Sequence, residues 1–449
     1  MDPRGPTTAN LTAPPVALGA VLKRIGPGLI ISANIVGSGE LIVTTQLGAR
    51  AGFVLLWFIV FSCVVKVFVQ VELGRFTVSE GTTTLEALNR LPGPRPLVSW
   101  VLWLWLMMYV GTLFQVSGML GSIAALFAPR DRAWAHALAC LVPAAACALI
   151  LSRGRYGAVE RWATGMVVLF TLSTIAAVLA LQWTPYRIGL PQLARGFAFE
   201  RPETFTVAFA AFGVTGVGAS ELIFYPYWCL EKGYARFVGP RDDSPEWLAR
   251  ARGWLRVMQV DAWVSMAIYT VGTVCFYLLG AAVLHAKGQE VTGAELVPVL
   301  SGMYSEVFGA AGAWVFVLGA FVVLFSTVFV STASNARLLS DGAALFRVLK
   351  DPSPERRRRL VQAGSIGIPL GTALVYLWVG EPVHLVMVGA LGQALMLPFL
   401  GLAALHFRHR ITAPGLRPGS SWTLLLWVAV LGIATVGAYQ AGRQLGLIA

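Results

Sequence analysis

Charged residues are scarce in this chain. Asp, Glu, Lys and Arg make up 12% of its 449 residues, whereas hydrophobic side chains make up 57%. Soluble domains carry about 25% charged residues, and the mean hydropathy here is +0.70. The composition therefore excludes a soluble globular domain and predicts an all-α integral membrane protein.

Several chemical signatures are also missing. The five cysteines show no CxxC spacing, which argues against a zinc site or a disulfide framework. The five histidines show no HxxxH or HExxH spacing, and no GxxxxGK[ST] phosphate loop occurs, so an ATP-driven pump is disfavoured. We expect no enzyme, no catalytic residues and no cofactor. Residues 1–24 lack an apolar run before a cleavage site, and we expect a disordered cytoplasmic tail there.

What the chain does have is long apolar segments. About 20 residues are needed to cross roughly 30 Å of hydrocarbon, and windows of that length predict eleven transmembrane helices. They lie near residues 27–48, 52–73, 97–127, 133–152, 158–183, 204–229, 257–285, 309–336, 359–379, 382–405 and 422–442.

The basic residues favour one orientation of these helices. If the N-terminus is cytoplasmic, 25 of the 34 Lys and Arg residues fall on the cytoplasmic side and 8 on the other, with Lys66 inside the second span. This bias follows the positive-inside rule, so the net charge of +12 needs no nucleic-acid partner. We expect a multi-pass protein of the cytoplasmic membrane, a monomer whose partners are the lipid bilayer and a small-molecule or ion substrate.

A short motif occurs twice. "VGSGEL" (36–41) lies in the first span and "VGASEL" (217–222) in the sixth, five spans later and therefore in the opposite orientation. A five-plus-five inverted repeat with a broken first helix in each half is the plan of LeuT-type transporters of the APC superfamily. The sequence predicts repeats over 25–183 and 204–405, and an eleventh helix with the C-terminus over 422–449.

The glycines of the two motifs mark the breaks. Glycine costs about 1 kcal/mol relative to alanine inside a helix, and unwound backbone within a membrane has to be buried in protein or line a cavity. Freed carbonyl groups bind cations and exposed N–H groups bind anions. The candidate substrate-binding residues are Gly37, Ser38, Gly39, Glu40, Thr215, Gly218, Ser220 and Glu221.

Glu40 and Glu221 are the candidate metal ligands. A charged side chain at mid-bilayer costs about 2.5–3.5 kcal/mol, so two at matched depth predict a shared cavity that binds a cation or titrates. Alternatively, each carboxylate caps the half-helix that follows it. The two interpretations are compatible, and both stay open.

Residues 26–57, "GPGLIISANIVGSGELIVTTQLGARAGFVLLW", resemble the first two spans of the NRAMP divalent-metal transporters. "GRYGAVERW" (154–162) and "MLPF" (396–399) are further similarities. The resemblance implies a LeuT-type secondary transporter in which spans one and six flank the substrate.

The chain departs from that family at its functional positions. Gly37 stands where the family has its metal-binding Asp, Glu40 replaces an Asn ligand, and residues 218–220 replace Met-Pro-His. Without the Met thioether, an oxygen site for a hard cation such as Mg²⁺ or Mn²⁺ is expected. Gln115 stands where the family has an Asp linked to proton movement, which implies weak or absent proton coupling.

Other interpretations remain. The "GSG" break (37–39) also resembles amino-acid transporters that cradle a substrate carboxylate, and a protein without transport activity is a third alternative. Gln115, Asp261 and Gln393 are candidate coupling or gating residues, although Asp261 is also expected to pair with Arg256 or another basic residue at the cytoplasmic boundary. Lys66 is expected to snorkel or to pair with Glu72, or else to balance the two glutamates. The polar run 326–337 provides either Na⁺ ligands or helix–helix contacts.

Overall fold

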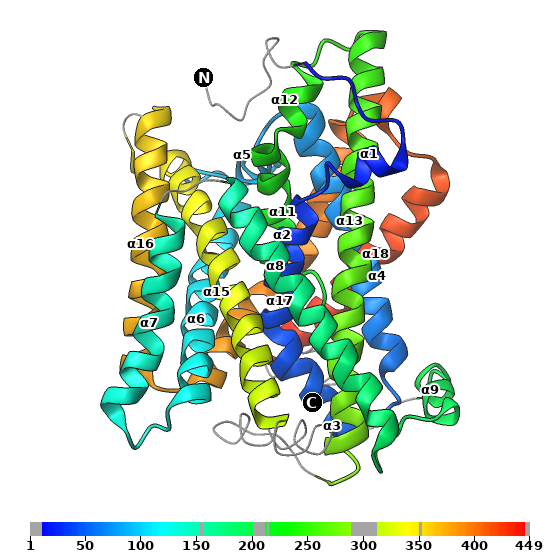
Figure 1. Cartoon of the computed structure of the whole chain (residues 1–449). Helices are drawn as coiled ribbons and strands as arrows, with labels where there is room; N and C mark the ends of the chain where they lie inside the picture. The colour runs from blue at the N-terminus through cyan, green and yellow to red at the C-terminus, as the bar shows by residue number, and fades with distance from the viewer. Residues whose placement is uncertain are drawn as a thin grey trace.

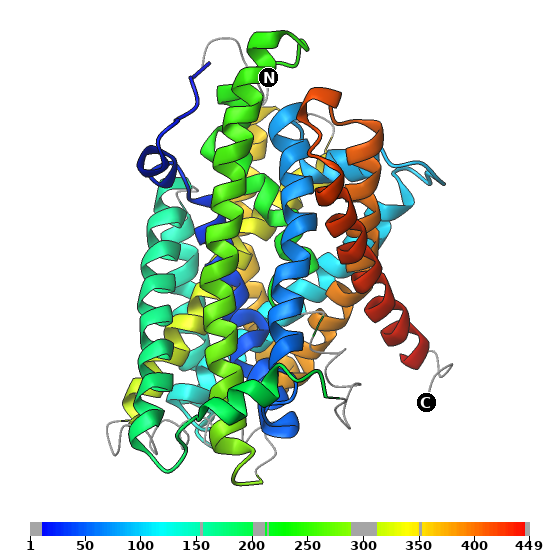
Figure 2. The same cartoon turned by 90° about the vertical axis from the view of Figure 1, so that its right-hand side faces the viewer.

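The structure is a computed structural model that describes residues 11–152, 156–200, 212, 215–288, 312–349 and 353–444. In that part of the chain every regular element is a helix, and the helices form one upright bundle (Figures 1 and 2). The short helix α1 and the last turns of α18 lie toward opposite ends of the bundle, as an odd number of crossings requires (Figure 2).

The elements are α1 (Leu18–Leu22), α2 (Pro27–Ile35), the π-helix η2 (Val36–Thr44), α3 (Thr45–Ala51), α4 (Leu56–Glu80), α5 (Thr84–Asn89), α6 (Trp100–Phe127), α7 (Ala133–Leu151), α8 (Tyr156–Ala180), η3 (Leu181–Trp183), α9 (Leu190–Gly196), α11 (Ala219–Lys232), α12 (Tyr234–Val238), α13 (Pro245–Leu279), η4 (Gly280–Leu284), α15 (Gly312–Leu345), α16 (Pro354–Val379), α17 (Pro382–Arg410), η7 (Pro414–Leu416) and α18 (Ser420–Gln444).

The prediction of an all-α bundle with about eleven spans is confirmed. Nine helices of the described residues are long and apolar enough to cross a membrane. They correspond to every predicted span except the first and the sixth. Those two are the spans with interrupted helices, since span one is divided into α2, η2 and α3, and α11 is the described helix of span six.

The connecting segments alternate between the two ends of the bundle, as the predicted order of spans requires. Helices α1, α5 and α12 gather at one end, and α3 and α9 lie at the other (Figure 1). Helix α13 begins at Pro245 rather than near residue 257. The Ser244 hydroxyl accepts a hydrogen bond from the backbone N–H of Trp247 at 3.1 Å, and this cap lets the polar stretch before the apolar span join the helix.

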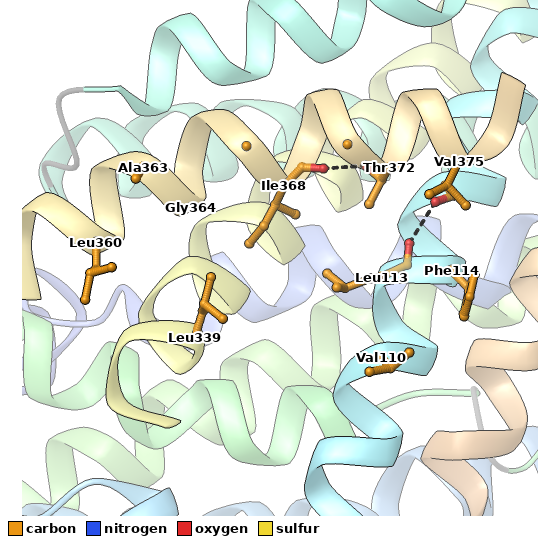
Figure 3. A pocket seen from close by; sticks show the side chains of 13 residues that line it. Val110, Leu113, Phe114, Leu339, Leu360, Ala363, Gly364, Ile368, Thr372 and Val375 are labelled. Carbon is orange, nitrogen blue, oxygen red and sulfur yellow. Dashed lines mark hydrogen bonds between the residues drawn. The ribbon is translucent and has the colours of Figure 1, made fainter. Parts of the chain in front are cut away.

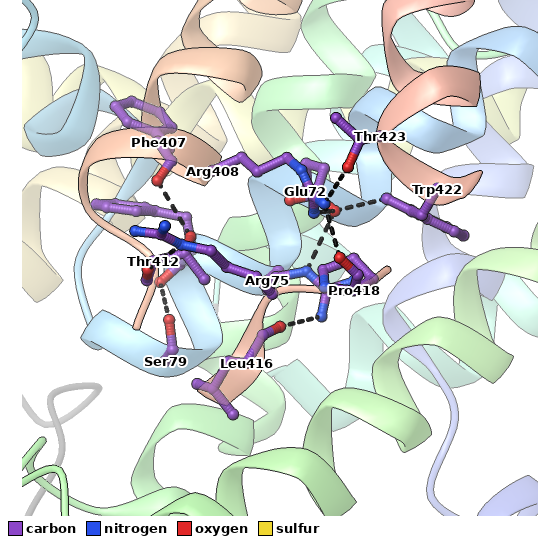
Figure 4. A network of polar contacts seen from close by, with 12 residues as sticks. Glu72, Arg75, Ser79, Phe407, Arg408, Thr412, Leu416, Pro418, Trp422 and Thr423 are labelled. Atoms are coloured by element: carbon purple, nitrogen blue, oxygen red, sulfur yellow. Dashed lines mark hydrogen bonds and ion pairs between the residues drawn. The ribbon is translucent and has the colours of Figure 1, made fainter. Parts of the chain in front are cut away.

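A buried ionic cluster joins α4, α17 and α18 (Figure 4). The Oε1 atom of Glu72 accepts hydrogen bonds from Arg75 Nε at 3.2 Å and from Trp422 Nε1 at 2.6 Å, and Arg408 Nη1 lies 3.6 Å away. The predicted pairing of Glu72 with Lys66 is therefore wrong, because the carboxylate already has two guanidinium partners.

Residues 11–24 are part of the predicted disordered tail, but here they pack against the bundle. The indole N–H of Trp254 donates to the carbonyl oxygen of Thr12 at 2.9 Å, and the Thr12 N–H donates to that of Phe237 at 3.3 Å. The prediction of disorder is therefore wrong for this segment, which contains α1 and contacts α12 and α13.

Candidate functional site

The first predicted break is a widened helix. Residues Val36–Thr44 form a π-helix between α2 and α3, so the chain stays coiled through "VGSGEL". The prediction of an unwound segment in span one is wrong in this respect. π segments inside α-helices are frequently found at functional sites.

Gly37 explains part of this geometry. A Cβ atom built on Gly37 would lie 2.1 Å from Thr327 Oγ1 and 2.2 Å from the carbonyl oxygen of Val323, so α15 packs directly on this backbone. The side chains of Ser38 and Glu40 and the surroundings of Gly39 lie outside what the structure describes. The predicted meeting of Glu40 with Glu221 stays a prediction.

The second break is found where it was predicted. Residues 215–217 form a bend, Gly216 has a φ of 68°, and α11 begins at Ala219 with Gly218 as its N-cap. Glu221 lies in the first turn of α11, where a carboxylate complements the helix dipole. The capping interpretation of Glu221 therefore fits its position, and it leaves the carboxylate able to make further contacts.

Glu221 is buried and contacts span one. The side-chain amide of Asn34 on α2 donates to Glu221 Oε1, and the Ser220 hydroxyl donates to Glu221 Oε2 at 2.9 Å. Asn34 is itself held from α15, because the Ser331 hydroxyl donates to Asn34 Oδ1 at 2.7 Å. A carboxylate, an amide and two hydroxyls from three helices thus form one buried polar chain.

The chain continues to two of the candidate coupling residues. Gln393 Oε1 on α17 accepts a hydrogen bond from the backbone N–H of Ser220 at 3.3 Å. It also lies 2.9 Å from the Ser220 hydroxyl, whose single proton is shared between Gln393 Oε1 and Glu221 Oε2. Gln393 Nε2 donates to Gln115 Oε1 on α6 at 2.8 Å. A Cβ atom on Gly389 would lie 2.5 Å from Gln115 Cβ, so this glycine allows α17 to lie close enough for the contact.

Asp261 is not part of this buried polar chain of hydrogen-bonded side chains. Its carboxylate accepts hydrogen bonds from the backbone N–H groups of Gly26 at 2.8 Å and Gly28 at 2.7 Å, and from the Tyr225 hydroxyl at 3.1 Å. It caps the first turn of α2 from α13, where a helix leaves its N–H groups unpaired. The partners of Asp261 are two backbone N–H groups and a hydroxyl, and no ion pair of Asp261 occurs among the described residues. The expected ion pair with Arg256 or another basic residue is therefore wrong.

Thr215 lies near the chain but is turned toward α4. Its carbonyl oxygen accepts hydrogen bonds from Lys66 Nζ at 2.6 Å and from the Ser62 hydroxyl at 3.3 Å. Its own hydroxyl is buried without a hydrogen-bond partner among the described residues. The structure thus brings Ser220, Glu221, Gln115 and Gln393 together and places Thr215 beside them.

The polar run of α15 makes helix–helix contacts. The Ser326 hydroxyl donates to the carbonyl oxygen of Ala33 at 2.8 Å, and the Thr327 hydroxyl donates to that of Asn34 at 3.0 Å. These contacts tie α15 to the last turn of α2, which is the structural role expected for hydroxyls in membranes. Sodium binding by this run stays a prediction.

The sequence interpretation missed Asn34, and it did not single out Ser331 within the polar run 326–337. Asn34 lies two residues before the "VGSGEL" motif inside an apolar span, and a buried amide at that position needs partners. That placement was a usable signal. Ser331 gave none, because it is one of several hydroxyl residues in its run.

The site offers oxygen and amide groups. Among the side chains that the structure describes, no three of the His, Cys, Asp and Glu type gather as a metal site. Cavities lined mainly by apolar side chains lie between other helices of the described residues. One of about 540 Å³ lies between α6 and α16, where Leu113 and Phe114 lie across from Ile368 (Figure 3). Among the described residues, the polar chain contains one carboxylate, that of Glu221.

Comparisons with known proteins agree with this architecture. The divalent metal cation transporter MntH of Deinococcus radiodurans is 24% identical over 320 residues, which are 69% of each chain. A mutant of the Eremococcus coleocola manganese transporter has a TM-score of 0.70 at 14% identity, over 98% of this chain and 91% of that one.

A further solved structure shows the same fold in another class of transporter. Mhp1, a nucleobase-cation-symport-1 family transporter, has a TM-score of 0.58 at 14% identity, over 99% of this chain and 96% of that one. The predicted LeuT-type fold with inverted repeats is confirmed by these likenesses. Residues 28–441 match the family described as natural resistance-associated macrophage protein-like, and the chain belongs to this Nramp family.

Proposed function

We propose that this protein is a secondary transporter that moves a divalent metal cation across the membrane by alternating access. The observation that carries the proposal is Glu221, a buried carboxylate at the restart of span six, held by Asn34 of span one. A buried carboxylate is costly in a membrane and marks an ion pathway. Membership of the Nramp family and the names of the two metal transporters among its relatives support the choice of substrate.

The chemistry of the polar chain favours a hard cation. Its acceptor atoms are the oxygens of Glu221, Ser220, Gln393 and Gln115, and oxygen ligands suit Mg²⁺ and Mn²⁺. Asn34 donates to the carboxylate, so in our proposal it orients Glu221 and the cation takes the remaining oxygens. Glu40 is the second proposed ligand, and the backbone of η2 supplies further carbonyl groups.

The remaining features of the proposal follow from the same residues. Gln115 is a neutral amide in contact with another amide, so we propose weak or absent proton coupling. The protein would act as a monomer in the cytoplasmic membrane, with its N-terminus inside, without a cofactor and without changing its substrate chemically. The two repeats would be residues 25–183 and 204–405.

Uptake into proteoliposomes tests the proposal. The protein should accumulate Mn²⁺ or Mg²⁺, and Glu221→Gln should abolish uptake while the variant remains folded. Glu355→Gln is the matched control, because that side chain is 75% exposed and lies in the first turn of α16. If none of a panel of divalent ions is taken up and an amino acid raises the thermal transition of the protein, the substrate would be an organic solute instead. Absence of both responses would support a protein without transport activity.

A further inference from the structure

The ammonium group of Lys66 lies at the interruption of span six, and the proposed function does not use it. Lys66 belongs to α4 and its side chain is fully buried. Its Nζ donates to the backbone carbonyl oxygens of Phe212 and Thr215, the second at 2.6 Å. The same Nζ lies 4.4 Å from the centroid of the Phe212 ring. Snorkelling to the membrane surface, one of the roles that the sequence interpretation gave Lys66, is therefore wrong.

This surrounding is the one that a bound cation takes in an interrupted membrane helix. Backbone carbonyl groups freed from helical pairing coordinate cations, and an aromatic face adds an attraction for an ammonium ion. Glu221, in the first turn of α11, also interacts electrostatically with the Lys66 ammonium. Each element that a small cation needs is present, and the lysine side chain supplies the cation.

Helix α4 is shaped to hold this segment. The Ser62 hydroxyl, one turn before Lys66, donates to the same Thr215 carbonyl at 3.3 Å. Gly216 has a φ of 68°, and a Cβ atom on it would lie 3.2 Å from the backbone of Cys63. The bend at residues 215–217 is thus fitted against residues 62–66 of α4, with the ammonium inside the contact.

We propose that Lys66 is a resident cation, tethered by its own side chain, which fills a site for a small primary ammonium ion built from the Phe212 and Thr215 carbonyl oxygens. A dissociable monovalent ion is then not required at this point of the transport cycle. The fixed positive charge also reduces the net negative charge around Glu221. The occupancy of the site does not depend on the proposed function, whereas its consequence for transport rests on that function.

Chemical rescue of a shortened side chain tests this assignment. Lys66→Ala removes the ammonium and opens the space it occupied, so the thermal transition of the detergent-solubilised protein should fall by several degrees. Methylammonium should restore at least half of that loss in a saturable manner. Tetramethylammonium should not, because it has no N–H group to donate. If Lys66→Ala can be purified only with methylammonium present throughout, the assignment is also supported.

Gln70→Ala is the matched control. Gln70 lies one turn further along α4, is fully buried, and has no hydrogen-bond partner for its side-chain amide among the described residues. Its truncation opens a cavity in the same helix without a pair of carbonyl acceptors. Methylammonium should therefore leave the transition of Gln70→Ala unchanged. Equal stabilisation of both variants by methylammonium and by tetramethylammonium would be a general salt effect and would overturn the assignment.

Lys66→Met separates the effect of losing the ammonium group from the effect of losing side-chain volume. It fills the volume but removes the ammonium donor from both carbonyl groups, and the Thr215 carbonyl keeps only the Ser62 hydroxyl at 3.3 Å. Lys66→Met should therefore be destabilised and should not respond to methylammonium. A Lys66→Met protein as stable as the unchanged protein would overturn the assignment. These measurements do not involve transport, so a failure of metal uptake in the unchanged protein would reject the proposed function and leave the assignment of Lys66 standing.

Discussion

The side-chain amide of Asn34 donates a hydrogen bond to the carboxylate of Glu221, which joins the last turn of α2 to the first turn of α11. The two residues are 187 positions apart in the chain. Spans one and six therefore meet at their interruptions, and in the described side chains they meet through an amide and a carboxylate. This contact gives the site an orientation, because the amide fixes one carboxylate oxygen.

Replacing Asn34 by alanine should weaken cation binding. The carboxylate would lose a buried donor, and a hydrogen bond to a charged group contributes about 1.5–3 kcal/mol, so we expect at least about a tenfold loss of Mn²⁺ affinity. Isothermal titration of the purified protein measures it. Ser331→Ala is the graded control, because it removes only the donor to Asn34 Oδ1 and should have a smaller effect. Unchanged affinity in Asn34→Ala would contradict the role assigned to the amide.

A carboxylate at position 115 should introduce proton movement. Gln115→Glu places an isosteric titratable group beside Gln393, which donates to residue 115 in the unchanged protein. We expect Mn²⁺ uptake by this variant to acidify the liposome lumen, measured with an enclosed pH-sensitive dye, and uptake by the unchanged protein to leave the lumenal pH constant. Gln115→Asn should behave like the unchanged protein. Strong acidification without any substitution would reject weak coupling.

The positions of the spans could be predicted from the sequence because they depend on local hydropathy. The restart of α11 was also predictable from a local signal, because three glycines precede it within a few residues. The form of the first interruption was not predictable. Whether glycines unwind a helix or widen it depends on what packs there, and Gly37 packs on Thr327, which is 290 residues away.

The partners of buried charges were the least predictable part. The sequence suggested nearby side chains for Asp261 and Lys66, but both residues contact distant backbone. Asp261 accepts from the N–H groups of Gly26 and Gly28, and Lys66 donates to the carbonyl groups of Phe212 and Thr215. Every residue carries such groups, so composition and spacing do not reveal which of them are left unpaired.

A methyl group at position 37 should disturb the contact of η2 with α15. The Cβ atom of Gly37→Ala would lie within 2.2 Å of Thr327 Oγ1 and of the Val323 carbonyl oxygen, and overpacking of this kind costs about 1–3 kcal/mol. We expect a lower thermal transition and reduced uptake. At Gly371 on α16 no atom lies within 4 Å of a Cβ atom, so Gly371→Ala should be neutral. Equal behaviour of the two variants would contradict the packing.

Removing the Asp261 carboxylate should loosen the start of span one. Asp261→Ala leaves the N–H groups of Gly26 and Gly28 and the hydroxyl of Tyr225 without their acceptor, and loss of a helix cap costs about 0.5–2 kcal/mol. Hydrogen exchange at the first turn of α2 should increase while exchange within α17 stays unchanged. Asp243→Ala, in an exposed surface pair, is the control. Unchanged exchange at α2 in Asp261→Ala would show that the cap is dispensable.

Removing the negative charge of Glu72 should destabilise the fold more than any of these substitutions. Its carboxylate is the one acidic group in contact with Arg75 and Arg408 among the described residues, and all three side chains are at most 4% exposed. Breaking a buried ion pair by removing one partner costs about 3–5 kcal/mol, because the other charge is left uncompensated. Glu72→Met should therefore lower the thermal transition of the purified protein strongly.

The matched variants separate this cost from a loss of packing. The triple variant Glu72→Met, Arg75→Met, Arg408→Met removes every charge of the cluster, and apolar replacement of a whole buried cluster is often close to neutral, so it should be more stable than Glu72→Met alone. Glu381→Gln, in the exposed pair with Arg130, should shift stability by less than about 1 kcal/mol. If the triple variant is less stable than the single one, the cluster is a net source of stability and uncompensated charge is not what destabilises Glu72→Met.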